Sequence, residues 1–274
     1  MTVPIDSRDE AGANRGMLSL RSAAWLAVIA SSLLASPARA EELETPPPPS
    51  AKSAGAGAFL PFTMGARSDT QRALVYGQGG YGGATKGAIF ETVIEAQVFG
   101  RVSLRAGGNY SELGGKFRPE VGLRLDALRQ ERHGVDLAVV GGYESSGFNM
   151  VRAATARVAV SRAFGDTRLV SNLGGGVGLD DGERYGDFRL AGLHAVTDKL
   201  HVGLDSRIRV DLERDSDEPS GEPSWELQSG PVASYALGRF VVTASGGVSA
   251  LKLRQGDTTS HVGAIGTLGL GAVF

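Results

Sequence analysis

The chain contains no cysteine among its 274 residues, which excludes disulfide frameworks, thiolate zinc sites and cysteine nucleophiles. Only 11 prolines are present, and the 40 glycines follow no Gly-X-Y period, so neither collagen nor a proline-glycine disordered chain fits. A formal net charge of −2 provides no basic surface for nucleic acid. After residue 40, no stretch approaches the roughly 20 apolar residues of a membrane-spanning helix. The composition therefore indicates a folded chain that tolerates many glycines.

The first 40 residues have the pattern of an export signal. Arg15 and Arg21 precede an uncharged apolar run over residues 22–35, and Ala38-Arg39-Ala40 places small residues where signal peptidase accepts them. The run of 14 residues is short for a helix that crosses a bilayer, so a retained anchor is the weaker alternative. We expect a signal peptide over residues 1–40 that is cleaved after Ala40.

Residues 41–72 are expected to form a proline-rich periplasmic spacer. Four consecutive prolines, Pro46 to Pro49, favour an extended and largely unpacked segment. The leader before this spacer is long, and a start at Met17 would shorten it to 24 residues. Met17 is therefore an alternative start, and the role of the spacer stays open.

From residue 73 to the C-terminus, polar and apolar residues alternate with the period of a β-strand. The clearest examples are residues 101–110, 116–127 and 200–212, in which every second position except Ser206 is apolar or glycine. Weaker alternation runs through 88–98, 135–144, 151–163, 168–179, 186–197, 225–237, 239–252 and 260–274. These eleven segments are expected to be strands with one apolar face, and Ala73 to Gly82 is the weakest candidate for a twelfth.

The connections between these segments alternate in length. Tight turns of two or three residues are expected at 99–100, 164–166, 197–199 and 237–239, where glycine or aspartate tolerates the dihedral angles of a hairpin. The other connections are longer and polar: 111–115, 144–149, 180–185, 213–224 and 254–260. Short turns at one end and long loops at the other are typical of transmembrane barrels.

The aromatic residues indicate which face meets lipid. Two rows on the apolar face are expected to bound an aliphatic band, as interfacial girdles do, whereas a soluble core would hold its largest rings in the middle. The row beside the long loops is Phe90, Tyr110, Phe117, Tyr143, Phe188 and Trp225, and the row beside the short turns or the terminus is Phe164, Tyr235, Phe240 and Phe274. The apolar face is therefore predicted to point outward.

Over residues 73–274 the sequence resembles the porin-like class of bacterial outer-membrane β-barrels. The last strand, His261 to Phe274, ends on an aromatic residue and looks like the signal that such proteins present to the barrel-assembly machinery. The resemblance implies an all-β transmembrane antiparallel up-and-down barrel, an outer-membrane location with lipid and lipopolysaccharide as neighbours, and often passive diffusion. Such barrels have even strand numbers, so twelve strands are expected, with ten as the alternative.

The polar face is expected to line the barrel interior with balanced charges. Its candidate lumen-lining residues are Glu91, Glu95, Arg101, Arg105, Arg118, Glu120, Arg124, Asp126, Asp136, Arg157, Arg168, Asp187, Arg189, Asp205, Arg207, Arg209, Asp211 and Glu226. Separated charges around a water-filled lumen would give a narrow passive channel for small polar solutes. Arginine-carboxylate pairs that fill the interior would instead give a structural or surface-interaction barrel. The first interpretation is favoured, because twelve strands enclose more space than eight.

No catalytic, cofactor or metal site is expected, and the protein is not expected to be an enzyme. A lipid-modifying barrel enzyme is a remote alternative, because His194 would face lipid and Ser206 would be its diagonal neighbour if residue 194 paired with residue 204. Five carboxylates within residues 213–222 lack the order of an EF-hand and indicate a solvated loop. His133 and His261 have no partner that the sequence reveals.

Overall fold

A computed structural model of the protein describes residues 73–111, 116–145, 152–180, 182–212, 223–253 and 260–274. The expected signal peptide, the spacer and the acidic loop over 213–222 lie outside these residues. The described part contains twelve strands: β1 (Ala73–Gly82), β2 (Gly87–Phe99), β3 (Val102–Ser111), β4 (Lys116–Leu128), β5 (Asp136–Glu144), β6 (Ala153–Phe164), β7 (Thr167–Gly178), β8 (Arg184–Ala195), β9 (Leu200–Asp211), β10 (Pro223–Leu237), β11 (Phe240–Leu253) and β12 (Ser260–Val273).

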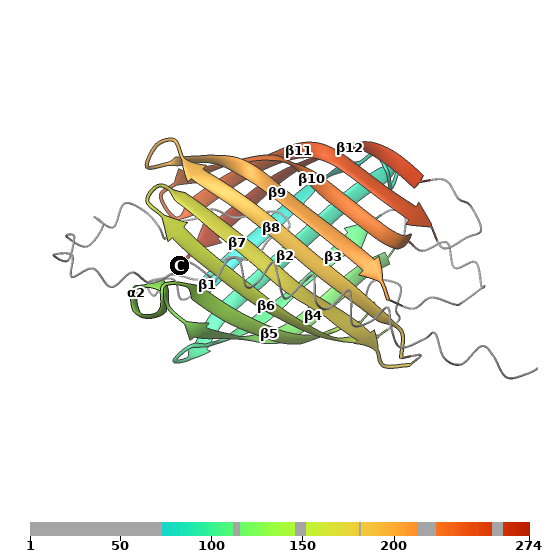
Figure 1. Ribbon diagram of the computed structural model, residues 1–274, viewed down its shortest axis with the longest axis horizontal. Coiled ribbons are helices and arrows are strands. Elements are labelled where there is room, and N and C mark those ends of the chain that lie inside the picture. Colours follow the sequence, from blue (N-terminus) through green and yellow to red (C-terminus); the bar gives the residue numbers. More distant parts are fainter. Residues whose placement is uncertain (1–72, 112–115, 146–151, 181, 213–222, 254–259) are drawn as a thin grey trace, which may run out of the picture. The chain divides into compact units, whose positions relative to one another are not determined.

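Each strand pairs antiparallel with its neighbours in sequence, and β1 pairs with β12, so the sheet closes into a barrel (Figure 1). Closure leaves no unpaired strand edge in contact with lipid. The backbone groups of Ala73 and Phe274 exchange hydrogen bonds of 3.0 and 2.9 Å, so both ends of the barrel sequence lie at one end of the barrel. The prediction of twelve strands is confirmed, and the alternative of ten is wrong.

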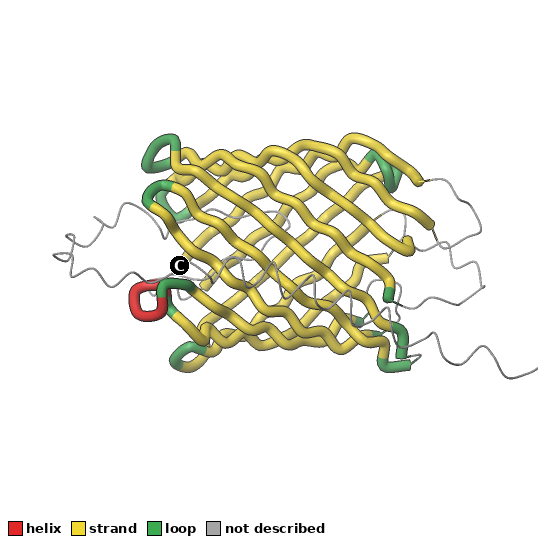
Figure 2. Tube along the Cα trace, viewed as in Figure 1, coloured by secondary structure: helices red, strands yellow, loops and turns green. Residues whose placement is uncertain are grey.

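The expected tight turns share one end of the barrel, which we call the turn end, and the opposite end is the loop end (Figure 2). Gly100, Gly165 and Gly238 occupy these turns with positive φ angles of 51°, 57° and 63°. The β4–β5 connection differs, because it contains a single helical turn, α2 (Gln130–His133), where the other connections at this end are tight. Within the described ranges no helix is both long and apolar enough to cross a membrane.

The outer face of the barrel is apolar and exposed. Leu204, Leu268 and Val262 expose 63%, 64% and 71% of their surface, although each lies within a strand. Exposed aliphatic residues on successive strands form the kind of band that contacts acyl chains in membrane barrels. The outward direction predicted for the leucines and valines agrees with these exposures.

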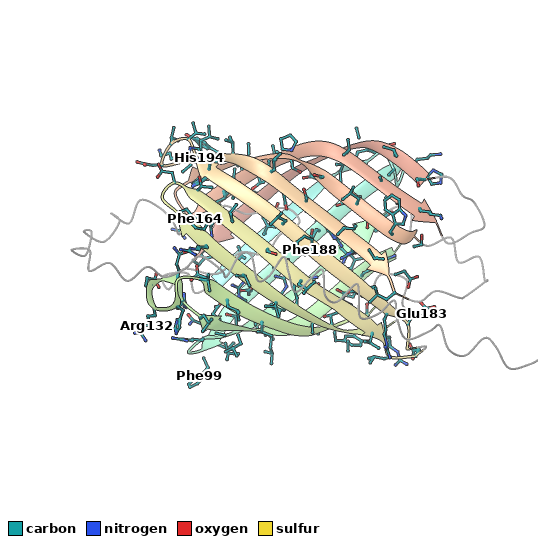
Figure 3. The ribbon with its side chains drawn as sticks, in the orientation of Figure 1. Phe99, Arg132, Phe164, Glu183, Phe188 and His194 are labelled. Carbon is teal, nitrogen blue, oxygen red and sulfur yellow. The ribbon has the colours of Figure 1, made fainter. Side chains whose placement is uncertain are left out.

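The aromatic residues on the outer face lie mostly near the ends of their strands, with one exception. Tyr143 is one residue from the end of β5 and Phe164 is the last residue of β6. Phe188 was expected beside a long loop, but it is the fifth residue of β8 and lies nearer the middle of the barrel (Figure 3). The expectation for Phe188 was wrong because β8 begins at Arg184, two residues earlier than the alternation indicated.

Candidate functional site

The charged side chains on the inner face form the candidate functional site. Most of the charges expected inside the barrel lie at the inward positions of the strand alternation, where they are buried or half-buried. Arg101 does not, because it is exposed in the turn before β3 and donates a 2.9 Å hydrogen bond to the Ala127 carbonyl oxygen. Glu144 was absent from the expected set, although it is buried at the end of β5 and shares the parity of Asp136. Counting alternate positions from Asp136 would have found it.

Four arginines surround the carboxylate of Asp187, which is 1% exposed. Arg189 Nε lies 2.8 Å from Oδ1, while Arg207 Nε and Arg209 Nε lie 3.3 and 3.0 Å from Oδ2. Arg157 Nη2 lies 3.7 Å from Oδ1. We call this group, Arg157, Arg189, Arg207 and Arg209 around Asp187, the arginine cage. Its members come from β6, β8 and β9, and Asp187 and Arg189 lie directly opposite Arg209 and Arg207 in register.

Gly174, on β7, makes possible the contact between Arg157 on β6 and Asp187 on β8. On neighbouring strands Gly174 pairs with Arg157 on one side and with Asp187 on the other. A side chain at this inward position would occupy the space between the guanidinium and the carboxylate. A Cβ there would also lie 2.6 Å from the Ala156 carbonyl oxygen. Glycine therefore allows β6 and β7 to approach closely and lets Arg157 reach Asp187.

A second ion-paired group lies on β2, β3 and β4. Arg105 Nη2 lies 3.0 Å from Glu120 Oε1 and Arg105 Nη1 lies 3.5 Å from Glu95 Oε2. Arg124 pairs with Asp126 at 2.8 Å and with Glu95 at 3.8 Å. Three carboxylates thus accompany two guanidinium groups here, the opposite balance to that of the arginine cage.

Charge is divided unevenly around the inner wall of the described strands. From β2 to β5 it consists of six carboxylates, Glu91, Glu95, Glu120, Asp126, Asp136 and Glu144, and three arginines, Arg105, Arg118 and Arg124. From β6 to β10 it consists of five arginines, Arg157, Arg168, Arg189, Arg207 and Arg209, and four carboxylates, Asp187, Asp205, Asp211 and Glu226. The described parts of β11, β12 and β1 carry no Asp, Glu, Lys or Arg on their inner face, where small residues such as Thr243, Ser249 and Thr267 are buried. The interior therefore has an acidic wall, an arginine-rich wall and an uncharged wall.

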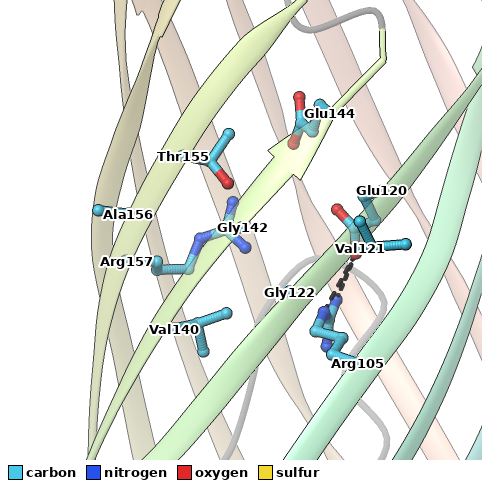
Figure 4. A pocket seen from close by; sticks show the side chains of 10 residues that line it. All are labelled: Arg105, Glu120, Val121, Gly122, Val140, Gly142, Glu144, Thr155, Ala156 and Arg157. Carbon is cyan, nitrogen blue, oxygen red and sulfur yellow. Dashed lines mark hydrogen bonds and ion pairs between the residues drawn. The ribbon is translucent and has the colours of Figure 1, made fainter.

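A small cavity lies between the acidic and the arginine-rich walls (Figure 4). Arg157 and Glu144 line it from neighbouring strands, and the Arg105–Glu120 pair lies across it. The Tyr185 hydroxyl donates a 3.5 Å hydrogen bond to Glu144. The cavity is small, with space for about one or two ordered water molecules. Positively and negatively charged side chains thus line the same small polar cavity inside the barrel.

Outside the membrane-spanning strands, Arg152 and Asp180 form an exposed ion pair at the loop end. Arg152 Nε donates a 2.9 Å hydrogen bond to Asp180 Oδ2, and Leu179 N donates one of 2.8 Å to the Arg152 carbonyl oxygen. The hydrogen bond from Arg152 lowers the pKa of the Asp180 carboxyl below its usual value. The pair connects the segment that enters β6 to the segment that leaves β7.

His194 and Ser206 do not form the catalytic pair that was considered. His194 pairs with Val202, not with Leu204, and Ser206 pairs with Leu190, so the two lie four positions apart along β8. Four residues of strand separate them by about 13 Å. His194 Nδ1 contacts Thr167 Oγ1 at 3.0 Å, and Ser206 Oγ contacts Ser229 Oγ at 2.7 Å. In the described part of the chain, no group of three or more His, Asp or Glu could hold a metal ion.

A closed twelve-stranded antiparallel barrel with an apolar outer face and a charged inner face has the architecture of the outer-membrane β-barrel class. Comparison with solved structures agrees with this class. The NanC porin matches with a TM-score of 0.50 and 9% identity, over 74% of this chain and 98% of that chain. No protein-family model and no curated protein matches the chain.

Two further solved structures show weaker similarity. The outer-membrane channel DcaP of Acinetobacter baumannii matches with a TM-score of 0.41 and 10% identity, over 73% of this chain and 71% of that chain. OmpT, an outer-membrane protein of Vibrio cholerae, matches with a TM-score of 0.36 and 11% identity, over 71% and 69%. At 9% identity, the similarity to the NanC porin bears on the fold alone.

Proposed function

We propose that the protein resides in the bacterial outer membrane and acts as a narrow passive channel for small polar solutes, without enzymatic activity. The observation that carries this proposal is the division of the inner wall into acidic, arginine-rich and uncharged parts. Opposed walls of unlike charge orient a dipolar or charged solute. The uncharged wall provides a surface along which the neutral part of the solute can move. Solutes would move down their own gradients.

The burial of the inner charges supports a narrow passage. Asp187, Glu95 and Asp205 are each 1% exposed, so the middle of the barrel does not surround a wide water-filled space. Such a constriction would admit only small solutes and would select them at close range, as charged rings do in channels.

The alternative function is a structural or surface-interaction barrel whose interior is closed by ion pairs. The observation that favours it is the same burial of the charged side chains, because the arginine cage and the pairs of Arg105 and Arg124 could fill the interior. The two functions differ in one measurable property, which is conductance.

Planar-bilayer recording on the refolded barrel tests the proposal. We expect discrete conductance steps that are reduced by Ser245→Arg, because Ser245 faces inward on the uncharged wall. The matched control is Ala244→Leu, the preceding residue, which faces outward. A heat-modifiability gel first establishes that each variant is folded. Folded protein without conductance steps, together with liposomes that do not swell in any small sugar, would refute the channel and favour the closed barrel.

A further inference from the structure

The arginine cage carries an excess of buried positive charge. Four guanidinium groups surround a single carboxylate, so the cage itself holds three more positive charges than negative ones. Arg189, Arg207 and Arg209 are each no more than 9% exposed. Burying charge without compensation is costly, so such an arrangement persists only if something else balances it.

Two donors of the cage are buried without a hydrogen-bond acceptor in the described residues. These are Arg157 Nε and Arg207 Nη2. The contact of Arg157 with Asp187 is an ion pair of 3.7 Å, too long for a hydrogen bond, and Arg207 uses its Nε atom on Asp187. A buried donor that lacks an acceptor loses its hydration without replacement.

Three other carboxylates of the interior accept hydrogen bonds from side chains outside the cage. Glu120 accepts a hydrogen bond of 3.1 Å from Arg105. Glu226 accepts a hydrogen bond from Gln228, and Glu144 accepts one from Tyr185. These side chains lower the overall positive potential of the interior, but their hydrogen bonds do not satisfy the two free donors of the cage.

We propose that the arginine cage is a binding site for a small oxyanion, a carboxylate or a phosphate, that enters the barrel. The proposal rests on the channel function above and names the class of solute. Planar guanidinium groups with several donors match the two oxygens of a carboxylate or phosphate, so the cage supplies both the charge and the geometry. Asp187 orients the four side chains and also weakens the attraction, which allows the anion to leave again.

Ion selectivity provides the first test. The permeability ratio of anion over cation is measured from the reversal potential of the folded channel in a gradient of potassium acetate. Arg157→Gln and Arg207→Gln are each expected to lower the ratio by about fourfold or more, because the loss of one unit charge at about 5 Å in water weakens the attraction of the anion about fourfold and also weakens the repulsion of the cation. Asp187→Asn is expected to raise it. Arg162→Gln, on the outer face of the same strand as Arg157, is the control and is expected to leave the ratio unchanged.

Binding provides a second test that does not need conduction. Thermal unfolding of the detergent-folded barrel is followed with inorganic phosphate, with acetate, and with chloride at equal ionic strength. A ligand that binds the folded state raises the melting temperature, so phosphate or acetate should stabilise the wild type more than chloride does. Arg157→Gln and Arg207→Gln should lose this extra stabilisation, while Arg162→Gln keeps it.

The outcomes separate this inference from the channel proposal. Stabilisation by phosphate or acetate that depends on the cage, in a barrel without conductance, would uphold the anion site and refute the channel. Conductance with a permeability ratio that does not respond to Arg157→Gln, Arg207→Gln or Asp187→Asn, and without specific stabilisation, would refute the anion site alone. The larger effect, with phosphate or with acetate, identifies which oxyanion the cage prefers.

Discussion

Substitution of Gly174 by alanine is expected to destabilise the barrel and to disturb the arginine cage. The new Cβ would lie 2.6 Å from the Ala156 carbonyl oxygen and 2.9 Å from Arg157 Cβ, whereas ordinary contact begins at 3.4 Å. Either β6 and β7 separate locally by several tenths of an ångström or the backbone distorts. Overpacking of this kind costs about 1–3 kcal/mol. The lower conformational entropy of unfolded alanine offsets about 0.4–1 kcal/mol of this cost.

The expected net loss from Gly174→Ala is therefore about 1–2 kcal/mol of unfolding free energy. It is measured by reversible denaturant unfolding in detergent or lipid, followed by the fluorescence of Trp225. Gly141→Ala is the matched control, because Gly141 lies on the outer face of β5 and a Cβ there meets no atom within 4 Å. This control should be neutral or slightly more stable than the wild type.

The comparison refutes the reasoning if Gly174→Ala is as stable as Gly141→Ala. The two strands would then not approach each other as closely as the contact with Ala156 requires.

A second measurement addresses the arginine cage. If Gly174→Ala is destabilised but retains the wild-type permeability ratio, the crossing of β7 by Arg157 does not determine the ion selectivity of the barrel.

Three further predictions concern the outer face and the loop end. Leu204→Arg places a charge on the exposed lipid face and should cost about 2–4 kcal/mol of unfolding free energy if this position lies near the bilayer midplane; a neutral effect in a lipid-based unfolding assay would contradict the orientation of the barrel. Arg152→Ala should raise the pKa of Asp180 toward its usual value in an NMR titration, because the hydrogen bond that lowers this pKa is lost. In the native protein the pair contributes to stability at pH values above the usual pKa of a carboxyl group, and this contribution is lost as the pH falls through the lowered pKa of Asp180. His194→Ala with Ser206→Ala should leave lipid turnover by outer-membrane fractions unchanged, and a loss of turnover would revive the enzymatic alternative.

The sequence alone was sufficient to predict the strands and their faces. Alternation is a local property of a β-strand, because successive side chains point to opposite sides whatever the strand pairs with. The pattern over 200–212 therefore predicted both a strand and the outward direction of Leu204. Glycine in the short connections likewise predicted the turns at Gly100, Gly165 and Gly238, because positive φ angles are a local requirement.

The neighbours of each inward side chain were decided by the tertiary structure. Arg157 and Asp187 are 30 positions apart in sequence, and only the pairing of both strands with β7 brings them together across Gly174. The same pairing places His194 opposite Val202 and separates it from Ser206. Alternation determines the face on which a residue lies, whereas register and barrel closure determine which residues meet there. The sequence thus determined which charges face the interior, whereas strand register and barrel closure placed four arginines around one carboxylate.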